Sequence, residues 1–516
     1  MNIRIKRLCR VGLLGLLVGL AAPGCDERSR SVNAAAKMPA SLKDSKSKVP
    51  AKAEEAPTPV AESTPAALAK WDMDLEDLYY GIYLNGSKMG WMNTRVTGTA
   101  DEVVVSTEMN AKITGMGTVS QIELTESRRY RASDGLLVGI AFRQAASTGA
   151  VEITGTLVGE QIELKVNAGT VTSLASLPAT ESLKGYQQVR ELVKTPVVGA
   201  KASGVRLDAS ALKVLTVNHT VQSVEKKVFG GVEVSAVTLN SEYPAMSLSE
   251  TAWYDNAGKL LETKIGGFFV ARLEAPDVAK RLDYQQDLLV ASVVATPAPI
   301  KKSASLSRLQ VDFEGFGEFP LPESARQRVK KRGSVWSLTL SKDEVPPVVA
   351  LGSGPDEQEF VKATPFVQSD APEMIEAAWK AVGSVTDRWT AVQRLVPFVY
   401  SHVEDEYVAA FSNAMEALRS GRGDCTEHSV LFVALARAIG IPARTAVGIA
   451  YWPAGKGFGW HAWAEVKIGK KWYAVDPTWN QPIADATHIK LAQGGPAEQA
   501  KVVMLLGKLK VLDVTL

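Results

Sequence analysis

The chain has 516 residues and a nearly balanced charge: 58 Lys and Arg stand against 56 Asp and Glu, which gives a formal net charge of +2 at pH 7. This balance shows no excess of basic residues of the kind typical of nucleic-acid-binding proteins, so no nucleic-acid partner is expected. The chain has three cysteines, Cys9, Cys25 and Cys425, and two of them lie within the first 25 residues. A disulfide framework in the body of the protein is thereby excluded.

Residues 1–25 have the pattern of a signal peptide. Basic residues come first, and an apolar run over 11–22 follows that is too short to anchor the chain across a bilayer. The stretch AAPGC at 21–25 resembles a bacterial lipobox, in which Cys25 becomes the lipid-bearing first residue of the mature protein. Pro23 departs from that pattern, so plain cleavage after Ala21 stays open. Lipidation of Cys25 and plain cleavage after Ala21 both predict an extracytoplasmic protein. Lipidation also predicts a lipoprotein tethered to a membrane, in the periplasm or at the cell surface.

Residues 26–70 are rich in Ala, Pro, Lys, Ser and Glu and have few large apolar side chains. Such a segment buries too little apolar surface to offset the entropy of ordering, so a disordered tether is expected. About 45 flexible residues span roughly 40 Å, enough to hold a folded body away from a membrane surface. The clustered lysines permit contact with anionic head groups, but a solvated linker is the preferred interpretation.

Residues 71–299 consist of short runs rich in Val, Thr, Tyr and Ile with turn signals between them. Asn85-Gly86, Gly230-Gly231 and 255–258 each separate two such runs, which is typical of β-hairpins. We expect an extended antiparallel sheet here, either a curved sheet or a sandwich. Aromatic residues such as Trp91 and Trp253 suit a ligand groove if exposed, but strand aromatics are more often core. The sequence assigns no function to this β-rich domain.

Residues 300–370 form a smaller β-rich segment after a linker rich in Pro and Lys, and 335–341 is its clearest strand. The apolar spacing then becomes helical. Residues 372–383 have Pro and Glu in the first turn and Gly at the end, and 387–403 form a second helix. The predicted fold class is therefore α+β, with antiparallel β-rich domains followed by a mixed domain over 371–516.

Cys425 stands at the predicted start of a further helix. Asp424 can cap this helix and Glu427 completes a capping box, while Gly440 and Pro442 end the apolar run. The positive end of the helix dipole favours the thiolate, which is the nucleophilic form of cysteine. The alternative is a buried cysteine that only fills apolar space. The polar neighbours of Cys425 weaken that alternative without removing it.

A β-hairpin is predicted around Gly469-Lys470, a pair suited to a type II′ turn. Pairing Ile468 with Lys471 then places His461 and Asp476 on one face, a diagonal step apart. A carboxylate in reach of an imidazole fixes its tautomer and stabilises its protonated form, while the other ring nitrogen faces a thiol. Taken separately, His461 reads as a surface strand residue and Asp476 as a turn residue. Together with a lone Cys they match what a thiol acyl-transfer site requires.

The stretches RGDCTEHSVLFVALARAIGIPAR, GFGWHAWAEV and WYAVDPTWN resemble the core of the bacterial transglutaminase-like superfamily. The fold of that superfamily is related to the papain α+β fold by circular permutation. The resemblance covers about 371–516 and implies a helix-start cysteine packed on an antiparallel sheet. It implies Cys425 as nucleophile, His461 as general base and acid, and Asp476 as orienting carboxylate. It also implies an oxyanion hole from the Cys425 backbone N–H and an upstream side chain, for which Asn413 and Tyr407 are candidates.

No cofactor and no metal are expected. Cys425 and His428 have the spacing of a metal pair, but no second cysteine or nearby histidine completes four ligands, so His428 is expected on the helix surface. His488, in the stretch ADATHIKL, is expected to stabilise a loop. The sequence contains neither an EF-hand loop nor a glycine-rich phosphate loop and so gives no basis for calcium or nucleotide binding.

The expected activity is attack of Cys425 on a carboxamide or peptide carbonyl, followed by transfer of the thioester acyl group to water or an amine. Hydrolysis is preferred, because an extracytoplasmic site is water-filled and nothing in the sequence indicates an amine pocket. The alternatives are an amine-dependent cross-linking transglutaminase and, of a different class, a non-catalytic tethered protein that binds peptides or acts as a scaffold. The expected partner is a protein or peptide substrate, with cell-envelope proteins as candidates.

Overall fold

The computed structural model describes residues 65–516, except 74–75, 85, 116–117, 147–148, 169–170, 247, 267–268, 283–292, 353, 407–412 and 496–499. The predicted signal peptide with Cys25 and most of the predicted tether lie outside the described residues. Within the described ranges, every helix is too short or too polar to cross a membrane.

Fourteen strands between Glu76 and Glu274 form one antiparallel sheet. Its strands are β1 (Glu76–Leu84), β2 (Ser87–Gly98), β3 (Glu102–Gly115), β4 (Thr118–Arg131), β5 (Leu137–Ala146), β6 (Gly149–Val158), β7 (Gln161–Ala168), β8 (Val171–Pro178), β9 (Lys201–Asp208), β10 (Lys213–Phe229), β11 (Val232–Tyr243), β12 (Leu248–Asp255), β13 (Leu260–Ile265) and β14 (Phe269–Glu274). Strands β1 to β8 follow one another across the sheet, as do β9 to β14. The two halves meet where β1 pairs with β14.

The predicted hairpins of this region are confirmed. β10 pairs with β11 across Gly230 and Gly231, whose φ values of 57° and 83° suit a type I′ turn. β12 pairs with β13 across 255–258, and β1 pairs with β2, with Leu84 opposite Ser87. Residue 85 lies outside the described residues. Trp253 is buried, as a core residue should be, and Trp91 is half-buried.

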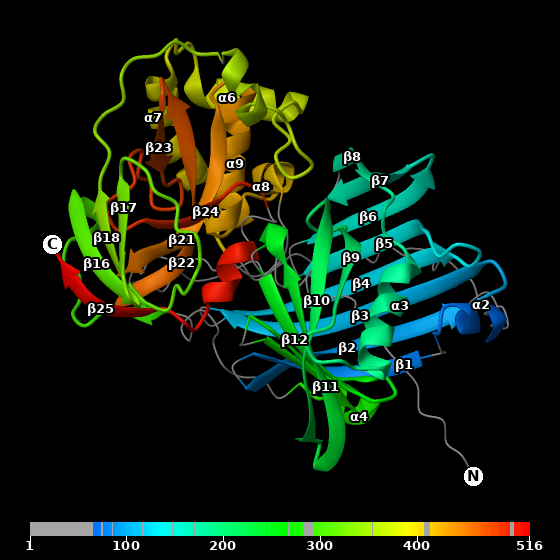
Figure 1. Ribbon diagram of the computed structural model, residues 1–516. Coiled ribbons are helices and arrows are strands. Elements are labelled where there is room, and N and C mark those ends of the chain that lie inside the picture. The colour runs from blue at the N-terminus through cyan, green and yellow to red at the C-terminus, as the bar shows by residue number, and fades with distance from the viewer. Residues whose placement is uncertain are drawn as a thin grey trace, which may run out of the picture.

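One apolar core joins both halves of the large sheet. Inward-facing residues such as Val105 and Met109 of β3 belong to the same packed cluster as Leu239 of β11 and Tyr254 of β12. The helix α3 (Leu183–Lys194) connects β8 to β9 and packs against β9. Figure 1 shows β9 to β12 lying in front of the blue and cyan strands, so the sheet curves over its own core. This is the curved-sheet form of the two expected arrangements.

Among the described residues of the C-terminal part, three helices surround a central fourth helix. They are α6 (Pro372–Val382), α7 (Arg388–His402), α8 (Ala414–Ser420) and α9 (Cys425–Ala438), of which the first two confirm the helices predicted from the sequence. α9 packs against the other three and also against the strands β21 and β22, so it is buried between the helices and a sheet. Short helices elsewhere are α2 (Pro65–Lys70), α4 (Pro276–Ala279), η1 (Pro244–Met246), η2 (Ser303–Ser305), η3 (Pro355–Phe360) and η4 (Ala500–Leu505).

Three smaller sheets complete the fold of the described residues. Their strands are β15 (Val294–Ala295), β16 (Arg308–Glu314), β17 (Gln327–Arg332), β18 (Val335–Ser341), β19 (Glu404–Asp405), β20 (Arg422–Gly423), β21 (Ala443–Trp452), β22 (Gly457–Ile468), β23 (Lys471–Val475), β24 (Ile489–Gln493) and β25 (Lys510–Thr515). One sheet has the order β15-β22-β21-β24 with β23 also paired to β22, a second has the order β17-β18-β16-β25, and β19 pairs with β20. β18 has the bounds predicted for its strand.

Two strand pairings cross the boundaries that the sequence suggested. β15 lies within the expected 71–299 domain, yet it pairs with β22 of the C-terminal sheet. β16 lies within the expected 300–370 segment, yet it pairs with β25 at the end of the chain, and Figure 1 shows the red β25 beside it. Phe313 of β16 also packs against Phe458 of β22. The segment 300–370 therefore shares its sheet and its core with the C-terminal part.

Candidate active site

The hairpin β22–β23 brings His461 and Asp476 together. Ile468 pairs with Lys471 and Ala464 with Val475, which is the register predicted from the sequence. His461 lies in β22 and Asp476 directly follows β23, and the His461 Nε2 atom lies 2.9 Å from Asp476 Oδ2. Both side chains are fully buried. The predicted contact between imidazole and carboxylate is therefore present.

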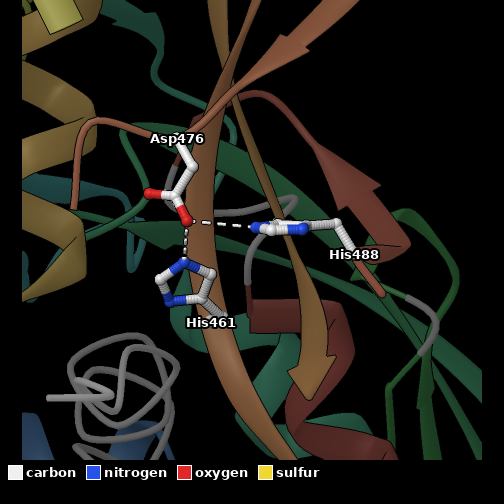
Figure 2. A group of neighbouring side chains, drawn as sticks. All are labelled: His461, Asp476 and His488. Carbon is white, nitrogen blue, oxygen red and sulfur yellow. Dashed lines mark hydrogen bonds and ion pairs between the residues drawn. The ribbon is translucent and has the colours of Figure 1, made fainter. Parts of the chain in front are cut away.

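The carboxylate of Asp476 is held on both of its oxygens. Oδ1 accepts hydrogen bonds from the backbone N–H groups of Thr478 at 2.8 Å and Trp479 at 3.2 Å. Oδ2 accepts from His461 and from a second imidazole, that of His488, at 3.0 Å. Figure 2 shows both rings directed at this one oxygen. Asp476 is consequently fixed in position rather than free to rotate.

His488 has a larger role than the sequence suggested. It does stabilise its loop, because its Nδ1 lies 3.3 Å from Oδ1 of Asp485, but its Nε2 also reaches Asp476. Asp485 in turn accepts hydrogen bonds from the backbone N–H and the hydroxyl of Thr487. The Asp-Ala-Thr-His spacing at 485–488 was the available signal for the loop, but local spacing did not indicate the contact with Asp476.

Gly448 permits the approach of the strand that follows His488. It lies opposite His461 in β22 and opposite Lys490 in β24. A β-carbon at position 448 would lie 2.0 Å from the backbone oxygen of Ile489, so a larger residue would push β24 away. With glycine there, the rings of His461 and His488 have their centroids 5.7 Å apart.

Burial and hydrogen bonding act in opposite directions on these groups. Burial would raise the pKa of Asp476, but the charges and hydrogen bonds of His461 and His488 outweigh it and hold the pKa well below its ordinary value. Burial likewise opposes ionisation of Asp485 and His488. Their mutual attraction prevails, lowering the pKa of Asp485 to about 2 and, together with Asp476, raising the pKa of His488 to about 9.

Tryptophan rings enclose the two histidines. Trp479 stacks on His461 with centroids 4.4 Å apart and planes 13° from parallel, and it meets His488 edge-on at 5.3 Å. Trp463 lies 6.2 Å from His461 and 5.2 Å from His488. An apolar enclosure strengthens the hydrogen bonds inside it, because water cannot compete for the donors and acceptors.

Cys425 is the first residue of α9. Asp424 accepts the backbone N–H of Thr426 at 2.8 Å, and Glu427 accepts the backbone N–H of Asp424 at 2.6 Å, so the predicted capping box is confirmed. The thiol is buried and forms no disulfide. Cys425 belongs to the same apolar cluster as Trp460 and Ala462, the two neighbours of His461 in β22. Helix α9 as a whole also contacts β22.

Residues 376–477 match the family model of the transglutaminase-like superfamily. The chain carries a transglutaminase-like domain. The matched range includes Cys425, His461 and Asp476 and ends one residue after Asp476, so His488 lies outside it. At the level of the superfamily, the match supports a thiol enzyme.

Two solved structures resemble parts of the chain. One is named a "Putative Cysteine Protease" from Cytophaga hutchinsonii; it is 17% identical, covers 41% of this chain and 82% of its own, and gives a TM-score of 0.29. The other is a beta-barrel-like protein of a domain of unknown function from Brucella abortus, 10% identical, with coverages of 38% and 94% and a TM-score of 0.32. Both TM-scores are too low to support a conclusion about this chain. No curated protein matches it.

The remaining predicted residues of the transglutaminase-like domain have mixed outcomes. Asn413 caps α8: its Oδ1 accepts the backbone N–H of Glu416 and its Nδ2 donates to the Glu416 carboxylate. A role of Asn413 in an oxyanion hole stays a prediction, and Tyr407 lies outside the described residues.

The prediction for His428 was wrong. It is buried, not on the helix surface, because other helices pack around α9. Its Nδ1 bonds to the backbone oxygen of Asp424, and its Nε2 faces Asp405 at 3.8 Å.

His461, Asp476 and His488 have the donor types of a metal site, and their ligand atoms lie within 4.8 Å of one another. However, both Nε2 atoms face the same carboxylate oxygen at hydrogen-bond distance, so each carries a proton there. A protonated ring nitrogen has no lone pair to offer a metal ion. We therefore interpret the three as a hydrogen-bonded group and assign no metal ligand among them.

Proposed function

We propose that this chain is an extracytoplasmic thiol enzyme that cleaves or transfers an amide acyl group through a thioester on Cys425. One observation carries the proposal. The Nε2 atom of His461 bonds to Asp476, while its buried Nδ1 has no hydrogen-bond partner among the described residues. An imidazole that is oriented through one nitrogen and open at the other is what a thiol nucleophile requires of its base.

The roles follow from the chemistry of each group. His461 takes the thiol proton at Nδ1, and Asp476 stabilises the imidazolium that forms. The thiolate at the start of α9 is favoured by the helix dipole and attacks the carbonyl carbon. His461 then gives the proton to the leaving amine, and a thioester remains on Cys425. Attack of water or an amine on this thioester releases the acyl group and restores the thiol.

The proposal includes the papain-like arrangement that the sequence resemblance implies. In it, the helix that carries the cysteine packs on an antiparallel sheet that carries the histidine. The contacts of α9 with β21 and β22, and the shared apolar cluster of Cys425 and Ala462, support this arrangement. The sequence resemblance implies an oxyanion hole that uses the backbone N–H of the nucleophilic cysteine, so the backbone N–H of Cys425 is our first choice as oxyanion donor.

Water is the proposed acyl acceptor, and amine-dependent cross-linking is the second candidate. An incubation of the purified protein with dimethylated casein, with and without dansylcadaverine, separates them. Release of ammonia or peptide products without the amine indicates hydrolysis, and labelled casein indicates transfer. Binding without either product in wild type and Cys425→Ala alike would indicate the non-catalytic scaffold instead.

The proposed location is the extracytoplasmic side of a bacterial membrane, in the periplasm or at the cell surface, with a lipid on Cys25 and a protein or peptide of the cell envelope as substrate. The leader and the low-complexity segment of the sequence support it. Fractionation of cells that express wild type or Cys25→Ser tests it: the wild type is expected in the membrane fraction and the variant in the soluble extracytoplasmic fraction. Equal recovery in the soluble fraction would leave only an unlipidated signal peptide.

A further inference from the structure

His488 is a buried titratable residue that the proposed mechanism does not use. Its two ring nitrogens face two different carboxylates, Asp476 at 3.0 Å and Asp485 at 3.3 Å. A carboxylate only accepts hydrogen bonds, so both nitrogens must donate and the ring must be an imidazolium. The pKa of His488, raised to about 9 by these carboxylates against the effect of burial, agrees with this reading.

The loop that carries His488 is anchored by residues from the preceding β-rich segment. Arg326 donates to the backbone oxygens of Asp485 at 2.6 Å and Ala484 at 3.3 Å. The side-chain amide of Gln327 donates to the backbone oxygen of Lys490 and accepts its backbone N–H, both at 2.8 Å. The loop is thus fixed on both sides of His488, by contacts that lie outside the family-matched range.

Oδ2 of Asp476 is shared between two histidines. If Asp476 faced His461 alone, its whole negative charge would favour the protonated form of His461. The positive charge of His488 on the same oxygen offsets part of that effect. A base that must also return its proton works best when neither form is strongly favoured.

We propose that His488 is a positioning residue for the reaction. As an imidazolium held between Asp476 and Asp485, it orients the Asp476 carboxylate toward His461 and offsets part of its negative charge, so that His461 releases its proton to the leaving group. This inference rests on the proposed function. It assigns His488 no contact with substrate.

The charged groups around His488 come from several elements. The turn after β23 contributes Asp476 and β22 contributes His461. The loop itself contributes Asp485. Beyond these, Lys490 of β24 is paired with Glu465 of β22 at 2.7 Å, and Arg326 with Asp343 at 3.3 Å, so both of these neighbouring cations are already matched by carboxylates.

The inference predicts a specific change in how Cys425 reacts with iodoacetamide as pH rises. Alkylation should show a lower step, where the thiolate–imidazolium pair forms, and an upper step, where His461 loses its proton and the thiolate becomes more nucleophilic. The ring of His488 lies 5.7 Å from that of His461. Removal of the positive charge of His488 should therefore move the upper step to higher pH, by about one to two units at an effective dielectric constant of 20 to 40.

The test compares wild type with His488→Gln, which keeps a neutral donor, and with Asp485→Asn, which removes one partner of the imidazolium. His402→Gln is the matched control, because His402 is a partly buried histidine on α7 that bonds to the backbone oxygen of Leu418. Alkylation of Cys425 is followed by peptide mass spectrometry from pH 3 to 11. We expect the upper step to move up in His488→Gln, to move less in Asp485→Asn, and to stay in His402→Gln.

The outcomes separate this inference from the proposed function. If the wild-type thiol titrates in a single step near 8.5, the ordinary value for cysteine, the proposed function itself fails. If the wild type shows two steps and His488→Gln leaves the upper one unmoved or moves it down, only the role of His488 is overturned. A nitrogen NMR spectrum of wild type settles the case where the variant does not fold: a neutral His488 ring at pH 7 overturns the inference, and a doubly protonated one supports it.

Discussion

Arg326 and Asp485 are joined across 159 residues of the chain, since Nη2 of Arg326 donates to the backbone oxygen of Asp485 at 2.6 Å. The buried guanidinium also pairs with Asp343, whose other oxygen binds Lys471 at 2.8 Å. Lys471 begins β23, the strand that leads to Asp476. The segment before the transglutaminase-like domain therefore supports both the loop of His488 and the strand of Asp476.

Replacement of Arg326 by Ala should destabilise the C-terminal part by about 3 kcal/mol, because it leaves Asp343 and two backbone oxygens buried with fewer partners. Denaturant unfolding followed by tryptophan fluorescence measures the change. Arg328→Ala is the control, since Arg328 is exposed on β17, the strand that begins one residue after Arg326. Unfolding of Arg326→Ala at the wild-type midpoint would show that the segment does not support the site.

The stacking of Trp479 on His461 should matter for turnover more than for folding. An aromatic stack contributes about 0.5–1.5 kcal/mol, and its loss in Trp479→Ala should lower kcat roughly tenfold by letting the imidazole tilt and admitting water to its bond with Asp476. Trp479→Phe should retain most of the activity. Trp379→Ala, at an exposed position on α6, serves as the control. Equal kcat values for all three variants would contradict a role of the stack.

Replacement of Asp476 by Asn should leave the fold intact and lower kcat roughly ten- to a thousandfold, with a smaller effect on KM. The penalty is smaller than in serine enzymes, where the equivalent loss is about ten-thousandfold, because a thiolate–imidazolium pair already holds the proton on the histidine. Steady-state kinetics together with a melting curve test this. Wild-type turnover would reduce the proposed triad to a Cys425–His461 dyad.

Stability should depend on pH through His488 and Asp485. The pKa of His488 rises from 6.5 to about 9 on folding, so its contribution is complete below 6.5 and is lost as pH increases through about 9. The pKa of Asp485 falls from 3.8 to about 2, so its contribution is complete above 3.8 and is lost as pH decreases through about 2. The alkaline loss is on the order of 3 kcal/mol. Melting curves should show it in wild type and a flatter profile in His488→Gln; identical profiles would contradict the imidazolium.

Local patterns in the sequence predicted the parts of the site that lie close along the chain. Alternation and the Gly469-Lys470 turn fixed the register that joins His461 to Asp476, and the capping residues located the start of α9 at Cys425. Strand runs with turn dipeptides likewise predicted the hairpins of the large sheet. Each of these features depends on residues within one hairpin or one helix turn.

The remaining features depend on pairings between distant segments. Nothing local to β16 indicates that its partner is β25, and nothing around Arg326 indicates that it binds the loop of His488. The prediction for His428 was wrong for the same reason. The helices that bury α9 are separate segments, and the apolar periodicity of α9 does not indicate that they pack against it. Periodicity predicts which face of an element is apolar, and tertiary pairing decides what covers it.

The central claim is that Cys425 is a nucleophile activated by His461. The most direct measurement is the pH dependence of iodoacetamide labelling at Cys425 in wild type and in His461→Ala, read by peptide mass spectrometry. The account predicts that the wild-type thiol becomes reactive well below pH 8.5, the ordinary value for cysteine, and that the variant returns to about that value. Titration near 8.5 in both proteins would contradict it.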